Sequence, residues 1–354
     1  MPGYRDMREI VRWLFLLSAM LLAPVTWAAD GSAKEQAQRQ QDQPLNNAPV
    51  WRDVRGGGGE KPYQTTQVRG VETNVLVQTE GEIWRQWRNG PITIYGGWLI
   101  IAVCAIIAAI YLLKGPIKLH QKPSGRTIER FNATERYAHW TMGISFCLLG
   151  ATGLIILFGK YVLLPMFGYT LFSWLAILSK NIHNFVALVF VASLLVFIVI
   201  YVKDNLPERG DFAWLAKGWR IFAGEHMPSG RFNAGEKVWF WLGVVALCLL
   251  VSASGLILLF PKLPYVDGAR SLMQLANVVH AVAAVLVIGF SLGHIYMGTI
   301  GVEGAYQNMR TGNTDETWAK EHHEYWYNEV KNQGPAGASR SAAPADSMKE
   351  GWKL

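Results

Sequence analysis

The chain has 354 residues, of which 51% are hydrophobic and only 17% are charged. Soluble globular domains usually carry about 25% charged residues, and here the apolar residues form long runs, so lipid is expected around much of the surface. The net charge of +7 does not indicate a nucleic-acid partner, because the basic residues lie in short loops between apolar runs, where they typically set membrane orientation.

The three cysteines, Cys104, Cys147 and Cys248, all lie inside apolar runs, and the sequence has no CxxC motif. This pattern argues against a structural zinc site, a cysteine-ligated iron–sulfur cluster and a c-type haem attachment site. The cysteines are interpreted as small, buried, apolar side chains.

Residues 1–28 have the features of a secretory signal peptide. The segment begins with three arginines, continues with a short apolar run over 13–22, and ends with small residues that suit cleavage after Ala28. The alternative is an uncleaved first membrane helix, but the run is short compared with the roughly 20 residues that a membrane span needs.

Residues 29–94 are expected to form an external, periplasmic segment. Its first part is rich in Gln and Gly (QAQRQQDQ, GGGG), which predicts extended or disordered chain up to about Val68. The remainder contains Trp84, Trp87 and Pro91 and is expected to pack near the membrane surface.

Five apolar segments long enough to cross a bilayer as helices follow: 95–113, 138–158, 182–202, 238–260 and 271–298. The apolar stretch 161–178 is interrupted by Pro165 and Gly168 and is predicted to be an interfacial loop helix. Residues 301–354 are expected to form a C-terminal tail.

The connecting loops differ in basic residues, which predicts the orientation in the membrane. Loops 114–137 and 203–237 each hold six Lys or Arg, whereas 159–181 and 261–270 each hold two. Loops rich in Lys and Arg usually face the cytoplasm. The mature N-terminus is therefore predicted outside and the C-terminus inside the inner membrane.

The sequence contains an internal repeat. The motif RFNA, followed two residues later by Glu, begins at Arg130 and again at Arg231, and the motif GLIxLF begins at Gly153 and Gly255. The repeat predicts two related helical hairpins, 138–202 and 238–298, that form a four-helix bundle, and cofactor sites are commonly built inside such bundles.

Four of the eight histidines lie in or at the ends of the apolar spans: His139, His183, His280 and His294. An ionisable residue within a span is a functional candidate by default. His280 and His294 are 14 residues apart, so on a helix they face nearly the same side about 21 Å apart. Matching the depths pairs His139 with His294 on the cytoplasmic side and His183 with His280 on the external side.

Neutral imidazoles bind haem iron well, so the two pairs predict two b-type haems held by four axial ligands. Small residues near the ligands, namely Gly143, Ala187, Ala281, Ala283, Ala284 and Gly293, would allow helices and haem to approach closely. The position equivalent to His139 in the second hairpin is Phe240, so the helix 271–298 is expected to serve both haems. A proton-coupled transporter that uses membrane histidines is the alternative of a different class.

At this point the sequence resembles the gamma (cytochrome b556) subunits of membrane-bound formate dehydrogenases over about residues 126–331. The resemblance rests on RFNA and AHW at 130–140, Ile182-His183, GRFNAG at 230–235 with Lys237 and Trp241, Val279-His280, GHIYM at 293–297, and WAK with His322-His323 and Trp326-Tyr327 near the end. It implies an all-α membrane protein with a four-helix transmembrane di-haem cytochrome b bundle over 126–300. Residues 1–125 depart from the shorter members of the family, and 95–113 is predicted from its apolar sequence as one additional N-terminal transmembrane helix.

The resemblance also implies that the chain carries electrons from a periplasmic iron–sulfur subunit through two b haems to membrane quinone, and it implies a quinone site. The family's quinone contacts match Asn233, Gly235 and His294, although Asn233 also suits a helix-capping role. The implied partners are an iron–sulfur beta subunit and a molybdenum or tungsten formate dehydrogenase alpha subunit, and the substrate is ubiquinone or menaquinone. Cytochromes of hydrogenases and thiosulfate reductases share the histidine frame and are the alternative within this class. His322 and His323 are expected at an interface with a partner.

Overall fold

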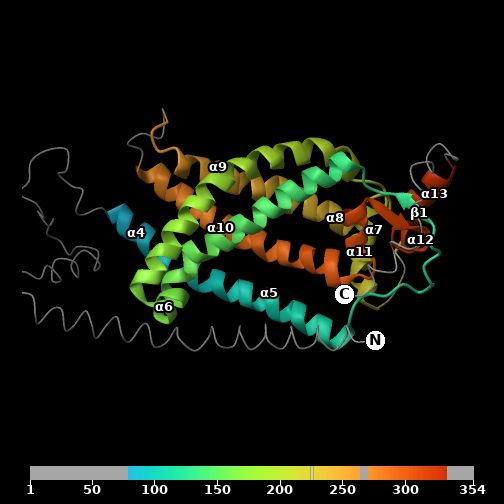
Figure 1. Ribbon diagram of the computed structural model, residues 1–354, viewed down its shortest axis with the longest axis horizontal. Helices are drawn as coiled ribbons and strands as arrows, with labels where there is room; N and C mark the ends of the chain where they lie inside the picture. The colour runs from blue at the N-terminus through green and yellow to red at the C-terminus, as the bar shows by residue number, and fades with distance from the viewer. Residues whose placement is uncertain (1–78, 224, 226, 264–269, 333–354) are drawn as a thin grey trace, which may run out of the picture.

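The computed structural model describes residues 79–223, 225, 227–263 and 270–332 (Figure 1). The predicted signal peptide, residues 29–78 and residues 333–354 lie outside the described residues. The described residues form helices and one two-stranded sheet. The elements are α4 (Thr79–Trp87), η1 (Arg88–Ile92), α5 (Thr93–Lys114), β1 (Thr127–Glu129), α6 (Ala133–Tyr201), η2 (Lys203–Asn205), α7 (Asp211–Lys217), η3 (Gly218–Ala223), α8 (Ala234–Val238), η4 (Trp239–Cys248), α9 (Leu249–Leu259), α10 (Arg270–Tyr296), η5 (Met297–Gly301), α11 (Ala305–Thr311), β2 (Asn313–Asp315), α12 (Glu316–His322) and α13 (Glu324–Asn332).

Among the described residues, four helices are long and apolar enough to cross a membrane, and with them the chain is an integral membrane protein. They are Ile83–Lys114, Ala133–Tyr201, Ala234–Leu259 and Ser271–Gly301. The first contains the predicted extra helix 95–113. Cys248 is buried, but Cys104 and Cys147 are exposed on the outer surface of the helices, so the expectation that all three cysteines are buried was wrong for these two.

The longest helix, α6, is a hairpin whose backbone reverses at Gly168. Gly168 has φ 73° and ψ 175°, outside helical geometry, and Pro165 precedes it by one turn. Three contacts join the limbs: the Tyr201 hydroxyl donates to the Glu135 carbonyl, the rings of Phe146 and Phe190 lie 6.0 Å apart, and Thr152 contacts His183. Each pair is centred on residue 168 to within one position. The predicted separate loop helix over 161–178 was therefore wrong: these residues are the tips of two limbs.

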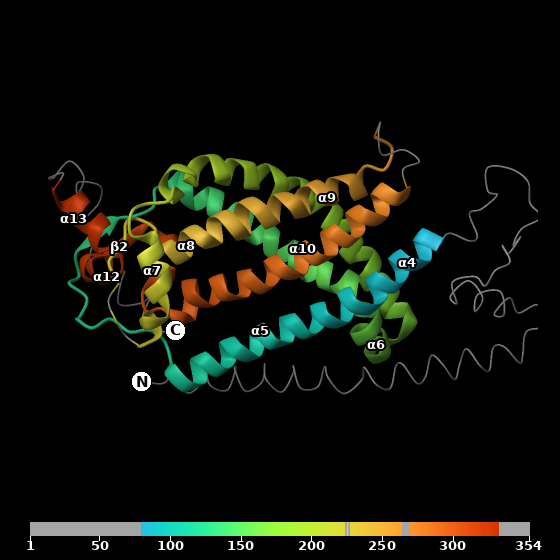
Figure 2. The same ribbon diagram turned by 180° about the vertical axis from the view of Figure 1, so that it is seen from behind.

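Helix α10 lies at the centre of the bundle, and α5 packs beside it (Figure 2). Two glycines allow this close approach, since Val285 of α10 packs on Gly96 and Leu99 of α5 packs on Gly289. Near the other end of the pair, the Tyr111 and Tyr296 rings meet edge to face at 6.5 Å. The additional helix is thus attached to the helix that carries two of the four candidate ligands.

The two RFNA motifs begin their helices in the same way. Asn132 caps α6 and Asn233 caps α8, each accepting a hydrogen bond from the backbone N–H of the Glu three residues on. That Glu, Glu135 or Glu236, accepts in return from the backbone N–H of the Asn. This reciprocal capping box explains the Asn and Glu of the repeated motif.

The arginines of the two motifs join the hairpins through an exchange of contacts, here called the arginine clasp. The Arg130 guanidinium donates to the Arg231 carbonyl at 2.7 Å, and the Arg231 guanidinium donates to the Arg130 carbonyl at 2.5 Å. Arg130 also pairs with Glu236 at 3.5 Å, while Arg231 pairs with Glu135 at 2.8 Å and with Asp204. Each arginine therefore binds the capping glutamate of the other repeat.

Residues 297–332, which follow α10, fold into a cap over the clasp, at the right in Figure 1. Strand β2 pairs antiparallel with β1, with Thr127 opposite Asp315, and Trp318 lies over the Arg130 guanidinium at 5.1 Å. His323 is 1% exposed and its Nδ1 hydrogen-bonds to the Gly230 carbonyl at 2.8 Å. Residues 301–332 of the predicted C-terminal tail are therefore folded against the bundle, and His323, which was expected at a partner interface, packs inside this chain.

Candidate haem sites

The structure brings the four membrane histidines together in two pairs. The rings of His139 and His294 have centroids 6.2 Å apart, and those of His183 and His280 have centroids 6.1 Å apart. Helix α10 supplies one member of each pair, and α6 supplies the other. Two imidazoles bound on opposite sides of one metal ion, through bonds of about 2 Å, also have centroids about 6 Å apart.

The pair of His183 and His280 is here called the outer pair, after its predicted external side, and the pair of His139 and His294 is called the inner pair. Each histidine of the outer pair is anchored through its Nδ1 atom. His183 Nδ1 lies 3.0 Å from the Thr152 hydroxyl, and His280 Nδ1 lies 3.0 Å from the Val251 carbonyl and 3.4 Å from the Ser254 hydroxyl. Hydrogen bonds of this kind fix ring orientation and tautomer in metal-binding histidines. The Nε2 atoms are left for a ligand.

Two repeat glycines make room for these imidazoles. A Cβ atom added to Gly153 would lie 3.3 Å from His183 Cε1, and one added to Gly255 would lie 3.0 Å from His280 Cε1. Thr152 and Ser254 directly precede these glycines. The repeated sequence therefore supplies a hydroxyl for the ring nitrogen and a glycine for the ring carbon at both histidines, with approximate two-fold symmetry.

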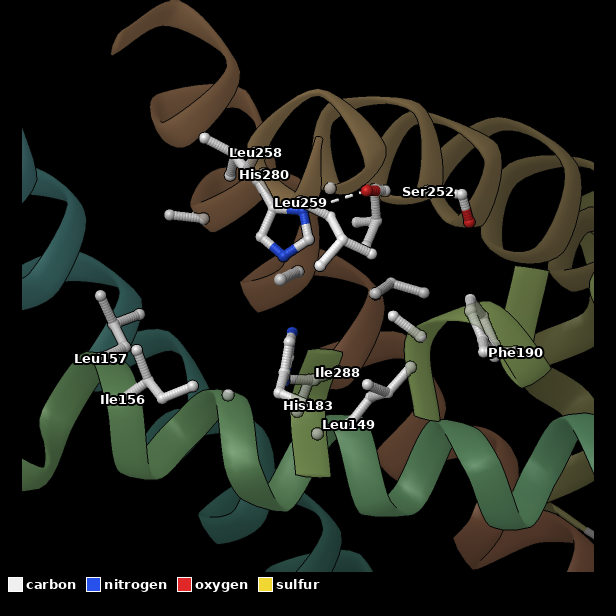
Figure 3. Close-up of a pocket in the computed structure, with 18 of the residues that line it drawn as sticks. Leu149, Ile156, Leu157, His183, Phe190, Ser252, Leu258, Leu259, His280 and Ile288 are labelled. Atoms are coloured by element: carbon white, nitrogen blue, oxygen red, sulfur yellow. Dashed lines mark hydrogen bonds between the residues drawn. The ribbon is translucent and has the colours of Figure 1, made fainter. Parts of the chain in front are cut away.

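A cavity surrounds the outer pair, and Figure 3 shows His183 and His280 facing one another across it. Its empty volume is about 1330 Å³, the open mouth included. Most of its lining is apolar, and three of the predicted small residues, Ala187, Ala281 and Ala284, line it. A flat, largely apolar cofactor suits such a lining.

Aromatic rings surround the inner pair. The Trp239 indole stacks on His294 at 5.3 Å with an interplanar angle of 17°, and the Trp140 and Phe197 rings lie 5.4 and 6.3 Å from His139. Phe240, the counterpart of His139 in the second hairpin, is buried against Phe197. Added Cβ atoms at Gly143 and Gly293 would meet no atom within 4 Å, so there is open space beside both ligands.

The donor set fits haem better than a bare metal ion. The described residues contain no group of three or more His, Cys, Asp or Glu that could hold a metal, whereas haem needs only two protein ligands because its ring supplies the others. The buried polar atoms without a protein partner include one at each site: Nδ1 of His139 in the inner pair, and the hydroxyl of Ser252, which lines the outer cavity. The residues present therefore fit two bis-histidine b haems.

Two of the predicted quinone residues, Asn233 and Gly235, lie at the start of α8, and the third, His294, lies on α10. The Asn233 side-chain oxygen is occupied by capping, and the Trp214 ring fills the space beside Gly235, 3.2 Å from where a Cβ would be. Trp239 follows Gly235 by one helical turn and stacks on His294. A continuous set of contacts thus leads from Gly235 to the inner histidine pair.

Sequence reasoning missed several residues of these sites: Thr152, Ser254, Trp214, Trp239, Arg88 and Lys180. The first two could have been found, because a hydroxyl residue precedes each repeat glycine. Trp239 follows the second RFNA motif closely, but nothing in a single sequence shows that it stacks on His294. Arg88 and Lys180, which line the outer cavity, lie outside every repeated motif.

Comparison with known proteins identifies the group to which this architecture belongs. The family model described as prokaryotic cytochrome b561 matches residues 130–312. The formate dehydrogenase cytochrome b556(fdo) subunit of Escherichia coli K12 is 34% identical over 58% of this chain and 94% of that protein. The nitrate-inducible cytochrome b556(Fdn) subunit of the same organism is 27% identical over 58% and 93%, and the Haemophilus influenzae cytochrome b556 subunit is 27% identical over 57% and 83%. The chain therefore belongs to the prokaryotic cytochrome b561 family and is related to the cytochrome b556 subunits of formate dehydrogenases.

Proposed function

We propose that this chain is the quinone-reducing membrane subunit of a formate dehydrogenase complex, taking electrons from an external iron–sulfur subunit and delivering them to membrane quinone through two b haems. The observation that carries the proposal is the arrangement of His139/His294 and His183/His280 as two facing pairs along α10. The names of the relatives support formate as the electron source. The relatives are named as cytochrome b556 subunits of formate dehydrogenases, so we assign formate oxidation to partner subunits.

When bound, the two haems supply one-electron carriers at two depths of the membrane. The residues of this chain hold and orient them. Thr152 and Ser254 fix the ring orientation of the outer pair, and the apolar cavity lining excludes water from around these histidines. The arginine clasp joins the two hairpins just beyond the inner pair, because Glu135 lies one turn before His139 on α6.

The proposed quinone contacts are Asn233, Gly235 and His294, at the clasp end of the bundle. The Asn233 oxygen caps α8, which leaves the side-chain NH₂ group to donate a hydrogen bond to a quinone carbonyl. Trp214 packs on Gly235, and its indole nitrogen is buried without a hydrogen-bond partner among the described residues, so it is a further candidate donor.

The proposed orientation in the inner membrane places the cap in the cytoplasm. The two loops with six basic residues each lead into the cap, where β1 pairs with β2 and the Gly230 carbonyl binds His323, whereas the loops with two each connect the other ends of the helices. That opposite end, with the outer histidine pair, would face the periplasm, the iron–sulfur beta subunit and the molybdenum or tungsten alpha subunit. Quinone reduction at the cap end would take up cytoplasmic protons and build membrane potential.

The order of electron transfer can be tested with single-histidine variants of the purified complex. In His294→Ala, formate should still reduce the remaining outer haem while quinone reduction falls to background. In His280→Ala, formate should fail to reduce the remaining inner haem, whereas added quinol should still reduce it. His120→Ala, in an exposed loop, is the matched control and should behave like the unmodified complex. Rapid reduction of the remaining haem by formate in His280→Ala would contradict the proposed path.

A further inference from the structure

The outer cavity is lined by two cations that the histidine sites do not use, Arg88 and Lys180. Lys180 precedes His183 by one helical turn, and Asn277, which also lines the cavity, precedes His280 by one turn. Both positions lie toward the end of the bundle at which α6 reverses and α5 begins. The positive charge is therefore concentrated at the outer end of an otherwise largely apolar cavity.

Arg88 belongs to the N-terminal part of the chain, outside the family match that begins at residue 130. Two contacts hold it at the cavity. The Trp84 indole donates to the Asn277 side chain at 3.2 Å, which ties α4 to α10, and the Thr93 hydroxyl donates to the Arg88 carbonyl at 2.6 Å. Gly90, whose backbone is not helical, and Pro91 bend η1 between Arg88 and the start of α5.

Neither cation forms an ion pair with a carboxylate among the described residues. The one side-chain hydrogen bond of Arg88 goes from Nη1 to the Asn89 side-chain oxygen at 3.0 Å, which leaves most of its donors unused. A guanidinium that lines a largely apolar cavity is strongly stabilised by an anion, and carboxylates accept two parallel hydrogen bonds from it. The cavity thus offers an anion site directly beside the outer histidine pair.

We propose that Arg88, together with Lys180, binds the carboxylate groups of the haem held by His183 and His280. The proposal rests on the proposed haem function, and it makes the N-terminal extension part of the outer haem site rather than a separate anchor. A nearby positive charge favours the reduced state, because reduction adds negative charge. Arg88 should therefore raise the reduction potential of the outer haem.

The test is a spectroscopic redox titration of the purified complex carrying Arg88→Gln. The outer haem should titrate at a lower potential and be retained less well, and the inner haem should be unchanged. The outer component is identified in a His294→Ala background, where it is the haem that remains. Lys160→Gln removes an exposed positive charge at the same end of the bundle, but Lys160 does not line the cavity, so this variant should leave both potentials unchanged.

Further variants separate charge from structure. In Arg88→Lys the outer haem should keep most of its raised reduction potential. In Asn89→Ala this potential should be unchanged, since Asn89 only orients the guanidinium. If Arg88→Gln loses the outer haem altogether, retention of haem and potential in Arg88→Lys still supports the proposal, and loss in both overturns it. If the anion site instead binds a lipid phosphate, the shift in the outer haem's potential should depend on added phosphatidylglycerol. That result overturns the proposal. An unchanged outer potential in Arg88→Gln, with two haems present, overturns the proposal alone, whereas absence of two haems from the unmodified chain overturns the proposed function.

Discussion

At the scale of single residues, the outer site depends on small side chains as much as on its histidines. Gly153 and Gly255 allow the imidazoles to lie against the opposite helix, and Thr152 and Ser254 bind their ring nitrogens. Because equivalent residues seat His183 and His280, a disruptive substitution beside either histidine should have the same effect on the outer haem. Of the two glycines, Gly255 has less space between an added Cβ atom and its histidine.

Replacing Gly255 by Leu should remove the outer haem and leave the inner one. A Cβ atom at this position already lies 3.0 Å from His280 Cε1, so the larger side chain forces the imidazole away from its partner. Haem content per chain should fall by half in the purified complex. The control is Gly298→Ala, whose added Cβ meets no atom within 4 Å. Full haem content in Gly255→Leu would show that the glycine has no role in seating His280.

The arginine clasp should contribute strongly to stability. Arg231→Ala removes bonds to Glu135, Asp204 and the Arg130 carbonyl and leaves the largely buried Glu135 without its cation. The free energy of unfolding should fall by about 3 kcal/mol, as expected for one partner of a buried charge pair. Arg126→Ala breaks the more exposed pair with Glu316 and should cost no more than about 1 kcal/mol. Thermal melts that follow haem absorbance would compare the two variants. Equal losses of stability would argue against a stabilising role for the clasp.

At the scale of elements, the sequence predicted the apolar helices better than the parts that connect them. Long apolar runs and the 14-residue spacing of His280 and His294 depend on local periodicity, which a single sequence shows. The reversal within 161–178 was misjudged because Pro165 and Gly168 suit either a loop helix or a sharp hairpin. The cap gave no periodic signal, because its short polar helices are held by distant contacts such as Thr127 with Asp315.

The candidate sites, like the fold, were predictable only in part. Histidines in apolar spans are conspicuous, so the sequence alone marks all four as candidates, and the structure brings them together in two pairs. The exchange of arginines between the RFNA motifs was not found, because a repeat shows that two segments are alike but not that they contact each other. Arg88 was missed because it precedes an apolar span, and only the packing of α4, η1 and α5 on α10 brings it to the cavity.

The cap should loosen as the pH falls. Burial, and secondarily the nearby Arg130 charge, hold the pKa of His323 well below its ordinary value of 6.5. The ring is then neutral in the folded cap but takes up a proton when the cap opens below pH 6.5. The stabilisation is therefore complete above that pH and is lost by up to about 1.4 kcal/mol for each unit below it.

Hydrogen exchange of the backbone amides in 313–332 would measure this effect at pH 7.5 and 5.5, after correction for intrinsic rates. Protection should fall more steeply toward pH 5.5 in the unmodified chain than in His323→Gln, which has no titrating ring at this position. The same dependence on pH in both proteins would assign the effect to other groups.

At the scale of the whole molecule, the charged residues and the two candidate haem sites are arranged along one axis. The basic loops, the cap and the inner histidine pair lie at one end, and Arg88, Lys180 and the outer pair lie toward the other. The proposed orientation predicts that a reporter active only in the periplasm is silent when fused after residue 332 and active when inserted in the segment 261–270. Activity of the reporter after residue 332 would reverse the proposed orientation.

The central claim is that one chain holds two haems, each between one histidine of α6 and one of α10. Haem quantification on the purified complex, with reduced-minus-oxidised spectra of the four single His→Ala variants, tests it most directly. The account predicts two b haems per chain in the unmodified protein and one in each variant, with His139→Ala matching His294→Ala and His183→Ala matching His280→Ala. A different stoichiometry, or spectra that pair the variants in another way, would contradict it.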